Sequence, residues 1–161
     1  MKTRNSQHSV PRDDRSSNPT IRTFLAEDDP LLMALLARIA SKHERVFIVG
    51  AAGDGRKALG YASSLQPDLV VTDLNMLGMD GAELTRRLKQ LPNPPIVFVA
   101  TADNTHEARD RCMAAGANAF MVKSGSLAAR FLSAIQEFFP DHLETTVPET
   151  KVLRESLITV A

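Results

Sequence analysis

The chain has 161 residues, enough for one domain of about 100–150 residues with tails, and its 43% hydrophobic content is sufficient for a buried core. Its 19 basic and 19 acidic residues balance, so no net charge attracts it to nucleic acid or acidic lipid. The single Cys112 excludes an internal disulfide. No apolar run approaches the roughly 20 residues that cross a bilayer, and the charged first twenty residues are no secretory signal. A cytoplasmic location without membrane insertion is therefore predicted.

Composition divides the chain into three parts. Residues 1–19 are rich in Ser, Asn, Arg and Asp, and we expect a disordered tail because they bury too little to offset the entropy of ordering. Residues 20–139 alternate apolar runs with helical patterns and form the predicted domain. Residues 140–161 have at most weak helical periodicity, and we interpret them as a tail or the remnant of a linker.

The predicted domain begins with a strand, Ile21–Ala26. Asp29 then caps a helix whose first position is occupied by Pro30, a favoured arrangement at helix N-termini. Apolar residues at helical spacing predict one buried face of this helix: Leu32, Leu35, Leu36 and Ile39.

Four further strand–helix units follow. The predicted strands are residues 46–49, 69–72, 96–100 and 119–122, and a turn of small residues at 50–55 closes the second strand. Gly116 ends the fourth helix and Pro140 ends the fifth. Five such units in sequence predict an α/β fold, a doubly wound parallel sheet of five strands with helices on both faces.

Polar side chains follow four of the five strands. They are the acidic cluster Glu27-Asp28-Asp29, the carboxylate of Asp73, the hydroxyl of Thr101 and the amine of Lys123. Ligands of open α/β sheets bind beyond the carboxyl ends of the strands, where parallel strands bring these groups together. Carboxylates, a hydroxyl and an amine in one pocket predict a metal-assisted phosphoryl-transfer site.

Each signal alone has a plainer interpretation. Acidic residues favour helix N-termini without any metal, and Thr101 or Lys123 after a strand is commonplace. Asp73 is more specific, because an unpaired carboxylate at the edge of an apolar sheet is costly unless a cation offsets its charge. Ala102 beside Thr101 is small and would leave the pocket open.

These motifs resemble those of the receiver domain of two-component response regulators, over about residues 20–139. The matching segments are Glu27-Asp28-Asp29, Asp73-Leu74-Asn75-Met76-Leu77-Gly78-Met79-Asp80-Gly81, Thr101-Ala102 and Phe120-Met121-Val122-Lys123. The run from Val46 to Gly55 is similar to receivers that precede a helix-turn-helix output domain. Only about twenty residues remain after Pro140, so we expect a single-domain regulator or one that has lost its effector.

The resemblance implies a flavodoxin-like fold with strand order 2-1-3-4-5 and a role for each motif. Asp73 would accept a phosphoryl group from a histidine kinase or a histidine phosphotransfer protein. Mg²⁺ would be held by Asp28, Asp29, Asp73 and the Asn75 carbonyl, with Glu27 flanking. The phosphoryl oxygens would be bound at Thr101, Ala102 and Lys123, and Phe120 would change rotamer as Thr101 moves.

The implied protein is a signalling phosphoacceptor and not an enzyme beyond assisting its own phosphorylation and dephosphorylation. Its expected partners are the kinase or phosphotransfer protein, a downstream protein target and a second copy in a homodimer, without direct DNA binding. The main alternative is a receiver-fold binding module that acts independently of phosphorylation. A flavodoxin-like electron carrier is disfavoured because Glu27-Asp28-Asp29 would repel a flavin phosphate, and an aspartyl phosphatase because Asn75 cannot act as a general acid.

Overall fold

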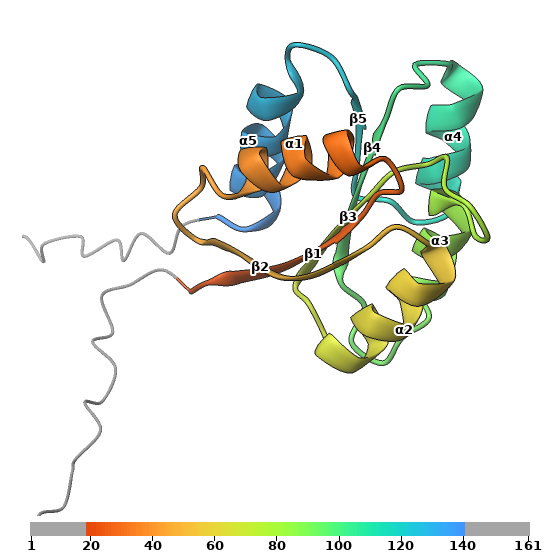
Figure 1. The fold of residues 1–161 in the computed structure, drawn as a ribbon, viewed down its shortest axis with the longest axis horizontal. Coiled ribbons are helices and arrows are strands. Elements are labelled where there is room, and N and C mark those ends of the chain that lie inside the picture. The colour runs from red at the N-terminus through yellow and green to blue at the C-terminus, as the bar shows by residue number, and fades with distance from the viewer. Residues whose placement is uncertain (1–18, 141–161) are drawn as a thin grey trace, which may run out of the picture.

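A computed structural model describes residues 19–140, in which five strands alternate with five helices (Figure 1). The elements are β1 (Ile21–Ala26), α1 (Pro30–Ala40), β2 (Val46–Ala52), α2 (Gly55–Leu65), β3 (Leu69–Thr72), α3 (Gly81–Leu88), β4 (Ile96–Thr101), α4 (His106–Ala114), β5 (Ala119–Val122) and α5 (Leu127–Phe138). The strands form one parallel sheet in the order β2-β1-β3-β4-β5. This confirms the predicted fold class. Of the tails predicted at residues 1–19 and 140–161, residues 1–18 and 141–161 lie outside the described residues.

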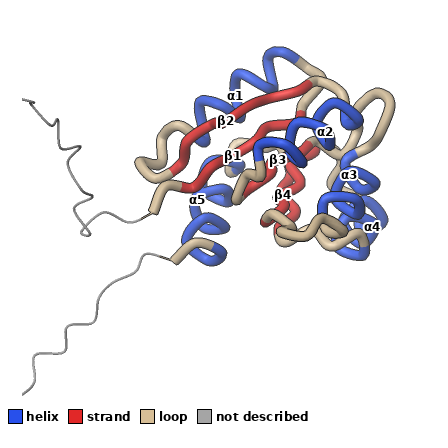
Figure 2. Tube along the Cα trace, turned by 90° about the horizontal axis from the view of Figure 1, so that it is seen from below, coloured by secondary structure: helices blue, strands red, loops and turns tan. Residues whose placement is uncertain are grey.

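The helices cover both faces of the sheet, with α1 and α5 on one face and α2, α3 and α4 on the other (Figures 1 and 2). Leu36 and Ile39 of α1 share one core with Phe131 and Ile135 of α5. The second face carries a core between α2, α3 and the sheet and a smaller one under α4. Because both faces are covered, the central strands are apolar throughout, as in β3, where all four residues are buried.

Side-chain caps fix where the helices start. Asp29, Asp54 and Asp80 each accept two backbone hydrogen bonds from the first turn of α1, α2 and α3. Thr105 caps α4 by accepting from the Ala108 amide. Each cap lies in the loop between a strand's carboxyl end and the helix that follows. The caps therefore shape the loops that carry the polar residues identified above.

The second strand is longer than predicted, because Gly50, Ala51 and Ala52 belong to β2 and not to a turn. They pair with Phe24, Leu25 and Ala26 of β1 after a register shift between Thr23 and Phe24. The physical reason is the Phe24 ring: a Cβ at residue 50 would lie 2.9 Å from its Cε2 atom, so the ring packs on the bare backbone of Gly50. Small residues here serve close packing within the sheet.

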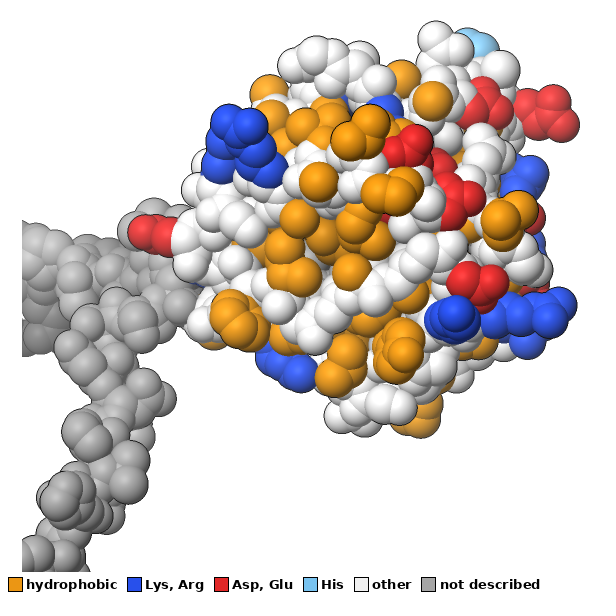
Figure 3. Space-filling view, in the orientation of Figure 1, with side chains coloured by type: hydrophobic (Ala, Val, Ile, Leu, Met, Phe, Trp, Pro, Cys, Tyr) orange, Lys and Arg blue, Asp and Glu red, His pale blue; other side chains and the backbone are white. Residues whose placement is uncertain are grey.

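The buried face of α1 also differs from the prediction. Leu36 is 4% exposed and Ile39 and Ala40 are buried, but Leu35 is 44% exposed. Successive helical residues are rotated by about 100°, so Leu35 lies at the edge of a stripe centred on Leu36. Figure 3 shows that apolar side chains also occupy much of the surface between α1 and α2. None of the helices within residues 19–140 is long and apolar enough to span a membrane.

Arg45 joins the two ends of the described domain. Its Nε atom donates to the Pro19 carbonyl at 3.1 Å and its Nη1 atom donates to the Phe139 carbonyl at 2.9 Å. The side chain is buried, and it precedes the first residue of β2. The start of β1 and the end of α5 are thereby held together at the end of the sheet opposite the polar cluster.

Leu36→Ala and Leu35→Ala form a matched pair that tests the face of α1. We expect Leu36→Ala to lower the free energy of unfolding by about 2–5 kcal/mol, because it leaves a cavity in the core. Leu35→Ala should cost less than about 1 kcal/mol, since the side chain is half exposed. Urea unfolding measures both, and equal losses would contradict the observed orientation of the helix.

Candidate functional site

The register of the sheet brings the polar residues to one edge. Ala26 of β1 is paired with Thr72 of β3, so Glu27 and Asp28 follow one strand and Asp73 follows its neighbour. Thr101 of β4 is paired with Val122 of β5, and the Lys123 amide donates to the Thr101 carbonyl at 2.7 Å. All of these groups therefore lie at the carboxyl edge of four adjacent strands.

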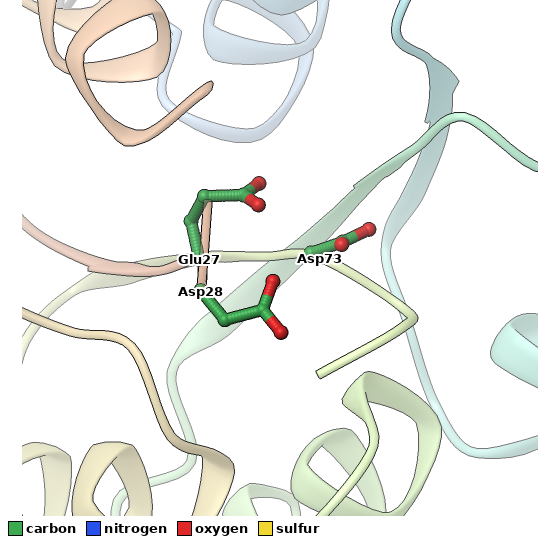
Figure 4. A group of neighbouring side chains, drawn as sticks. All are labelled: Glu27, Asp28 and Asp73. Carbon is green, nitrogen blue, oxygen red and sulfur yellow. The ribbon is translucent and has the colours of Figure 1, made fainter. Parts of the chain in front are cut away.

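Three carboxylates form a close group at this edge. Glu27, Asp28 and Asp73 each offer one oxygen, and these oxygens lie within 4.8 Å of one another. Figure 4 shows the three side chains directed into the same space from the ends of β1 and β3. Glu27 is only 2% exposed and Asp73 is buried, whereas Asp28 is exposed. The group is therefore half enclosed by the sheet and open to solvent at Asp28.

The ammonium of Lys123 lies between two of these carboxylates. Its Nζ atom is 2.5 Å from Glu27 Oε2 and 3.3 Å from Asp73 Oδ1, and both the lysine and glutamate side chains are almost fully buried. Burial raises the pKa of the Glu27 carboxyl above its ordinary value, although the hydrogen bond from Lys123 offsets part of this effect. The second oxygen, Glu27 Oε1, accepts from the Asp29 amide at 3.3 Å. Both Glu27 oxygens are thus engaged by protein donors.

Asp29 occupies a different position from the one expected of a metal ligand. Its Oδ1 atom accepts from the amides of Leu31 and Leu32 at 2.8 and 3.1 Å, which makes it the N-cap of α1. It does not belong to the group formed by Glu27, Asp28 and Asp73. The acidic pair that enters the site is therefore Glu27 and Asp28, one residue earlier than the pair predicted.

Asp73 is held by backbone groups of Leu74 and Ala26 and packs against Gly81 of α3. Its Oδ1 atom accepts from the Leu74 amide at 2.7 Å, and its amide donates to the Ala26 carbonyl at 2.8 Å. A Cβ at Gly81 would lie 2.0 Å from the Asp73 carbonyl oxygen, so only glycine fits this contact. The Gly81 amide also donates to the Leu74 carbonyl, which closes the loop in which Asn75 is exposed.

The hydroxyl of Thr101 is linked to α4 by a series of hydrogen bonds. Thr101 Oγ1 accepts from the Asp103 amide at 3.2 Å, and Asp103 Oδ1 accepts from the amide and the hydroxyl of Thr105 at 2.9 and 2.7 Å. The backbone hydrogen bond from Thr105 lowers the pKa of Asp103 below its ordinary value. Thr105 in turn caps α4. Sequence reasoning missed Asp103, although Asp followed two residues later by Thr is typical of such local hydrogen bonding.

The aromatic residue at this edge contacts the same helix. Phe120 is half buried and packs against the small core formed by residues of α3, α4 and the adjoining loops, which includes Leu74, Ala108 and Cys112. Ala102, next to Thr101, is exposed. Phe120 of β5 therefore packs on the same small core as the buried residues of α4.

A family model for the response regulator receiver domain matches residues 23–136. The chain therefore belongs to the response regulator receiver domain family of two-component systems.

Similar curated proteins include protein-glutamate methylesterase/protein-glutamine glutaminase 2 of Methanospirillum hungatei, 33% identical over 137 residues that make up 83% of this chain and 39% of that protein. The transcriptional regulatory protein PdtaR of Mycobacterium tuberculosis is 37% identical over 106 residues, 66% of this chain and 51% of that protein. The first curated relatives are matched over 30% to 54% of their length, so this chain spans about a third to a half of them.

Solved structures agree with the fold. The NarL signal receiver domain of Mycobacterium tuberculosis has a TM-score of 0.69 and 27% identity, with 74% of this chain and 95% of that chain covered. The CheX-CheY-BeF3-Mg complex of Borrelia burgdorferi has a TM-score of 0.70 at 21% identity, over 78% of this chain and 94% of that chain, and shows the fold alone.

The acidic group fits a divalent cation. When all three carboxylates are ionised, Lys123 compensates one of their three charges, and oxygen atoms of this kind are the ligands that Mg²⁺ prefers. The exposed Asp28 leaves room for the water molecules that Mg²⁺ usually retains. Receiver domains generally bind Mg²⁺ at an acidic pocket, and this chain has an acidic pocket at the carboxyl edge of its sheet.

Gly81→Ala and Gly60→Ala test the contact that positions Asp73. We expect Gly81→Ala to lower the free energy of unfolding by about 1–3 kcal/mol, because the new methyl group meets the Asp73 carbonyl. Gly60→Ala, in the interior of α2 with open space around it, should instead stabilise the protein by up to about 1 kcal/mol. Urea unfolding measures the free energy of unfolding of both variants. A change of the same sign in the two would contradict the contact between Gly81 and Asp73.

Proposed function

We propose that this chain is a phosphorylation-dependent response regulator in which Asp73 accepts a phosphoryl group. The donor is the phosphohistidine of a sensor kinase or of a histidine phosphotransfer protein. The observation that carries the proposal is the buried Asp73 carboxylate, placed within 3.3 Å of the Lys123 ammonium and beside the carboxylate of Asp28. A nucleophile, a fixed positive charge and a cation site are thereby brought to one point.

The transfer forms one bond and breaks another. An Asp73 oxygen attacks phosphorus, the N–P bond of the donor breaks, and the electron pair returns to the imidazole. Asp73 Oδ1 is held by the Leu74 amide and lies near Lys123, so Oδ2 is the oxygen left to attack. Lys123 then neutralises a phosphoryl oxygen as a point charge. Mg²⁺ supplies further charge neutralisation when it is bound.

The ligand set follows from the contacts of each acidic residue. Asp28 and Asp73 have carboxylates directed into the shared space, and the Asn75 carbonyl belongs to the loop that leaves Asp73. Glu27 has both oxygens engaged, and we assign it the role of holding Lys123 in place. Asp29 is assigned to capping α1 and not to the metal.

The phosphoryl group switches the protein through Thr101. Phosphorylation replaces the single negative charge of the Asp73 carboxylate with a phosphoryl group that carries about −1.5 to −2 charges, and these attract the Thr101 hydroxyl. Moving Thr101 pulls on Asp103 and Thr105, and therefore on the start of α4. Phe120, packed against the core under α4, adjusts as that core shifts. The surface of α4, β5 and α5 then binds a downstream protein target or a second copy of the chain.

The same fold also suits a binding module that does not respond to phosphate. The connected residues Thr101, Asp103 and Thr105 favour the switch, because a constitutive module has no need of this linkage. We assign the chain no catalysis beyond its own phosphorylation and dephosphorylation. A cytoplasmic location is part of this proposal, and Cys112, a free buried thiol, is compatible with it.

The first test is the intact mass of the protein after incubation with acetyl phosphate. We expect an increase of one phosphoryl group that requires Mg²⁺ and disappears in Asp73→Asn, which keeps the shape of the side chain but removes the nucleophile. An adduct that survives in Asp73→Asn would place the phosphoryl group elsewhere. A protein that binds Mg²⁺ but no phosphoryl group from acetyl phosphate or a phosphorylated kinase would favour the constitutive module.

Asp28→Asn and Asp29→Asn form a matched pair for the metal site. Unit charges 4 Å apart near a protein surface interact by about 4 kcal/mol, so loss of the Asp28 charge should weaken Mg²⁺ binding tenfold or more. Asp29→Asn should leave the affinity nearly unchanged, and Asn retains the helix cap. Isothermal titration calorimetry with MgCl₂ measures both. A larger loss in Asp29→Asn would restore that residue as a ligand.

A further inference from the structure

We propose that the ion pair between Asp80 at the start of α3 and Arg111 of α4 is a latch that holds α4 against the movement that phosphorylation drives. The proposal concerns regulation of the same site and rests on the proposed function. Arg111 Nη2 lies 2.9 Å from Asp80 Oδ2. The pair joins the loop that follows Asp73 to the helix that follows Thr101.

Asp80 is the fixed member of the pair. Its Oδ1 atom accepts from the amides of Ala82 and Glu83, both at 2.9 Å, and so caps α3 while Oδ2 faces Arg111. The neighbouring Gly81 packs directly on the Asp73 carbonyl. Partial burial raises the pKa of Asp80, but the Glu83 amide and the charge of Arg111 outweigh it and lower the pKa below its ordinary value. Asp80 is thus an ionised group at the end of the loop that follows Asp73.

Arg111 is the mobile member, because α4 is anchored by small side chains. The helix buries Ala108 and Cys112, whereas α5 buries Leu127, Phe131 and Ile135. A helix that buries little apolar surface shifts at a lower cost in free energy. Its first residues are tied to Thr101 through Asp103 and Thr105, so a movement of Thr101 reaches Arg111.

A cavity beside Arg111 leaves room for this movement. It measures about 240 Å³, and it is lined by residues of the phosphoacceptor loop, the loop after β4, and α4: Leu74, Asn75, Asp103, Thr105, Glu107, Ala108 and Arg111. Thr105 and Ala108 line it together with Asn75, so α4 can approach the Asp73 loop before the two surfaces meet. Arg111 lines this cavity and Asp80 does not, so we infer that a movement of α4 into the cavity alters the contact between the two side chains.

The strength of the Asp80–Arg111 ion pair sets how strongly a phosphoryl group must favour the alternative conformation of α4. Both side chains are about half exposed, and ion pairs of this kind contribute modestly, equivalent to roughly 1.5- to 5-fold in an equilibrium constant. If the pair favours the conformation described here, its loss raises the population of the alternative conformation by that factor. A ligand that binds the alternative conformation then gains apparent affinity by the same factor.

The first arm of the test needs no phosphoryl group. Hydrogen exchange of the α4 amides is measured in the wild type, Asp80→Asn, Arg111→Gln and the double variant, with Arg109→Gln on the same helix as the control. Asn keeps the cap of α3. We expect both single variants to exchange roughly 1.5- to 5-fold faster in α4 and the double variant no faster than either. Single variants that behave like Arg109→Gln, or whose effects add fully in the double variant, would overturn the latch.

The second arm measures the apparent dissociation constant for beryllium fluoride, a phosphoryl mimic, with saturating Mg²⁺. We expect it to fall roughly 1.5- to 5-fold in Asp80→Asn and in Arg111→Gln, and to be unchanged in Arg109→Gln. Unchanged constants in every variant, with a wild type that binds, would overturn the latch and leave the proposed function intact. A wild type that does not bind beryllium fluoride would overturn the proposed function, and with it the role of the ion pair in a switch. The hydrogen-exchange measurement would then still show whether the ion pair holds α4 in place.

Discussion

The structure of this site depends on one buried ammonium group placed between two carboxylates. Lys123 bonds Glu27 and lies beside Asp73, and burying either carboxylate without it would leave a costly uncompensated charge. The parallel register of β1, β3, β4 and β5 makes this placement possible, since it brings groups from residues 27, 73, 101 and 123 to one edge. The remaining negative charge suits the site to a cation, and the Lys123 ammonium is the group suited to a phosphoryl oxygen.

The same arrangement provides the route by which we propose that a change at Asp73 reaches the surface of α4. Asp73 contacts α3 through Gly81, and Thr101 contacts α4 through Asp103 and Thr105. One side of the site therefore packs closely on α3, and the other is linked to α4, a helix with a small buried face. A localised charge acts on such a structure by biasing a packing element with two positions, and not by a general loosening of the fold.

Much of the fold followed from the sequence because both faces of the sheet are covered. Short apolar runs located all five strands, four of which are followed by polar residues, and Asp29 and Pro30 located the start of α1. The sequence alone did not indicate which of the three consecutive acids enter the site, because this depends on how the loop after β1 turns into the helix. The length of β2 was missed because the Phe24 ring packs on Gly50, a contact between neighbouring strands that no local pattern indicates. The Asp80–Arg111 pair was missed because it joins two helices whose relative rotation no local pattern specifies.

The most direct measurement is the Mg²⁺ affinity of Lys123→Met compared with the wild type, by titration calorimetry. The ammonium lies 3.3 Å from Asp73 Oδ1 and neutralises charge that a metal would otherwise meet. Its replacement by a neutral side chain of similar length should therefore tighten Mg²⁺ binding severalfold and lower the stability of the metal-free protein. Unchanged or weaker Mg²⁺ binding, with unchanged stability, would contradict a site organised around the Lys123 charge.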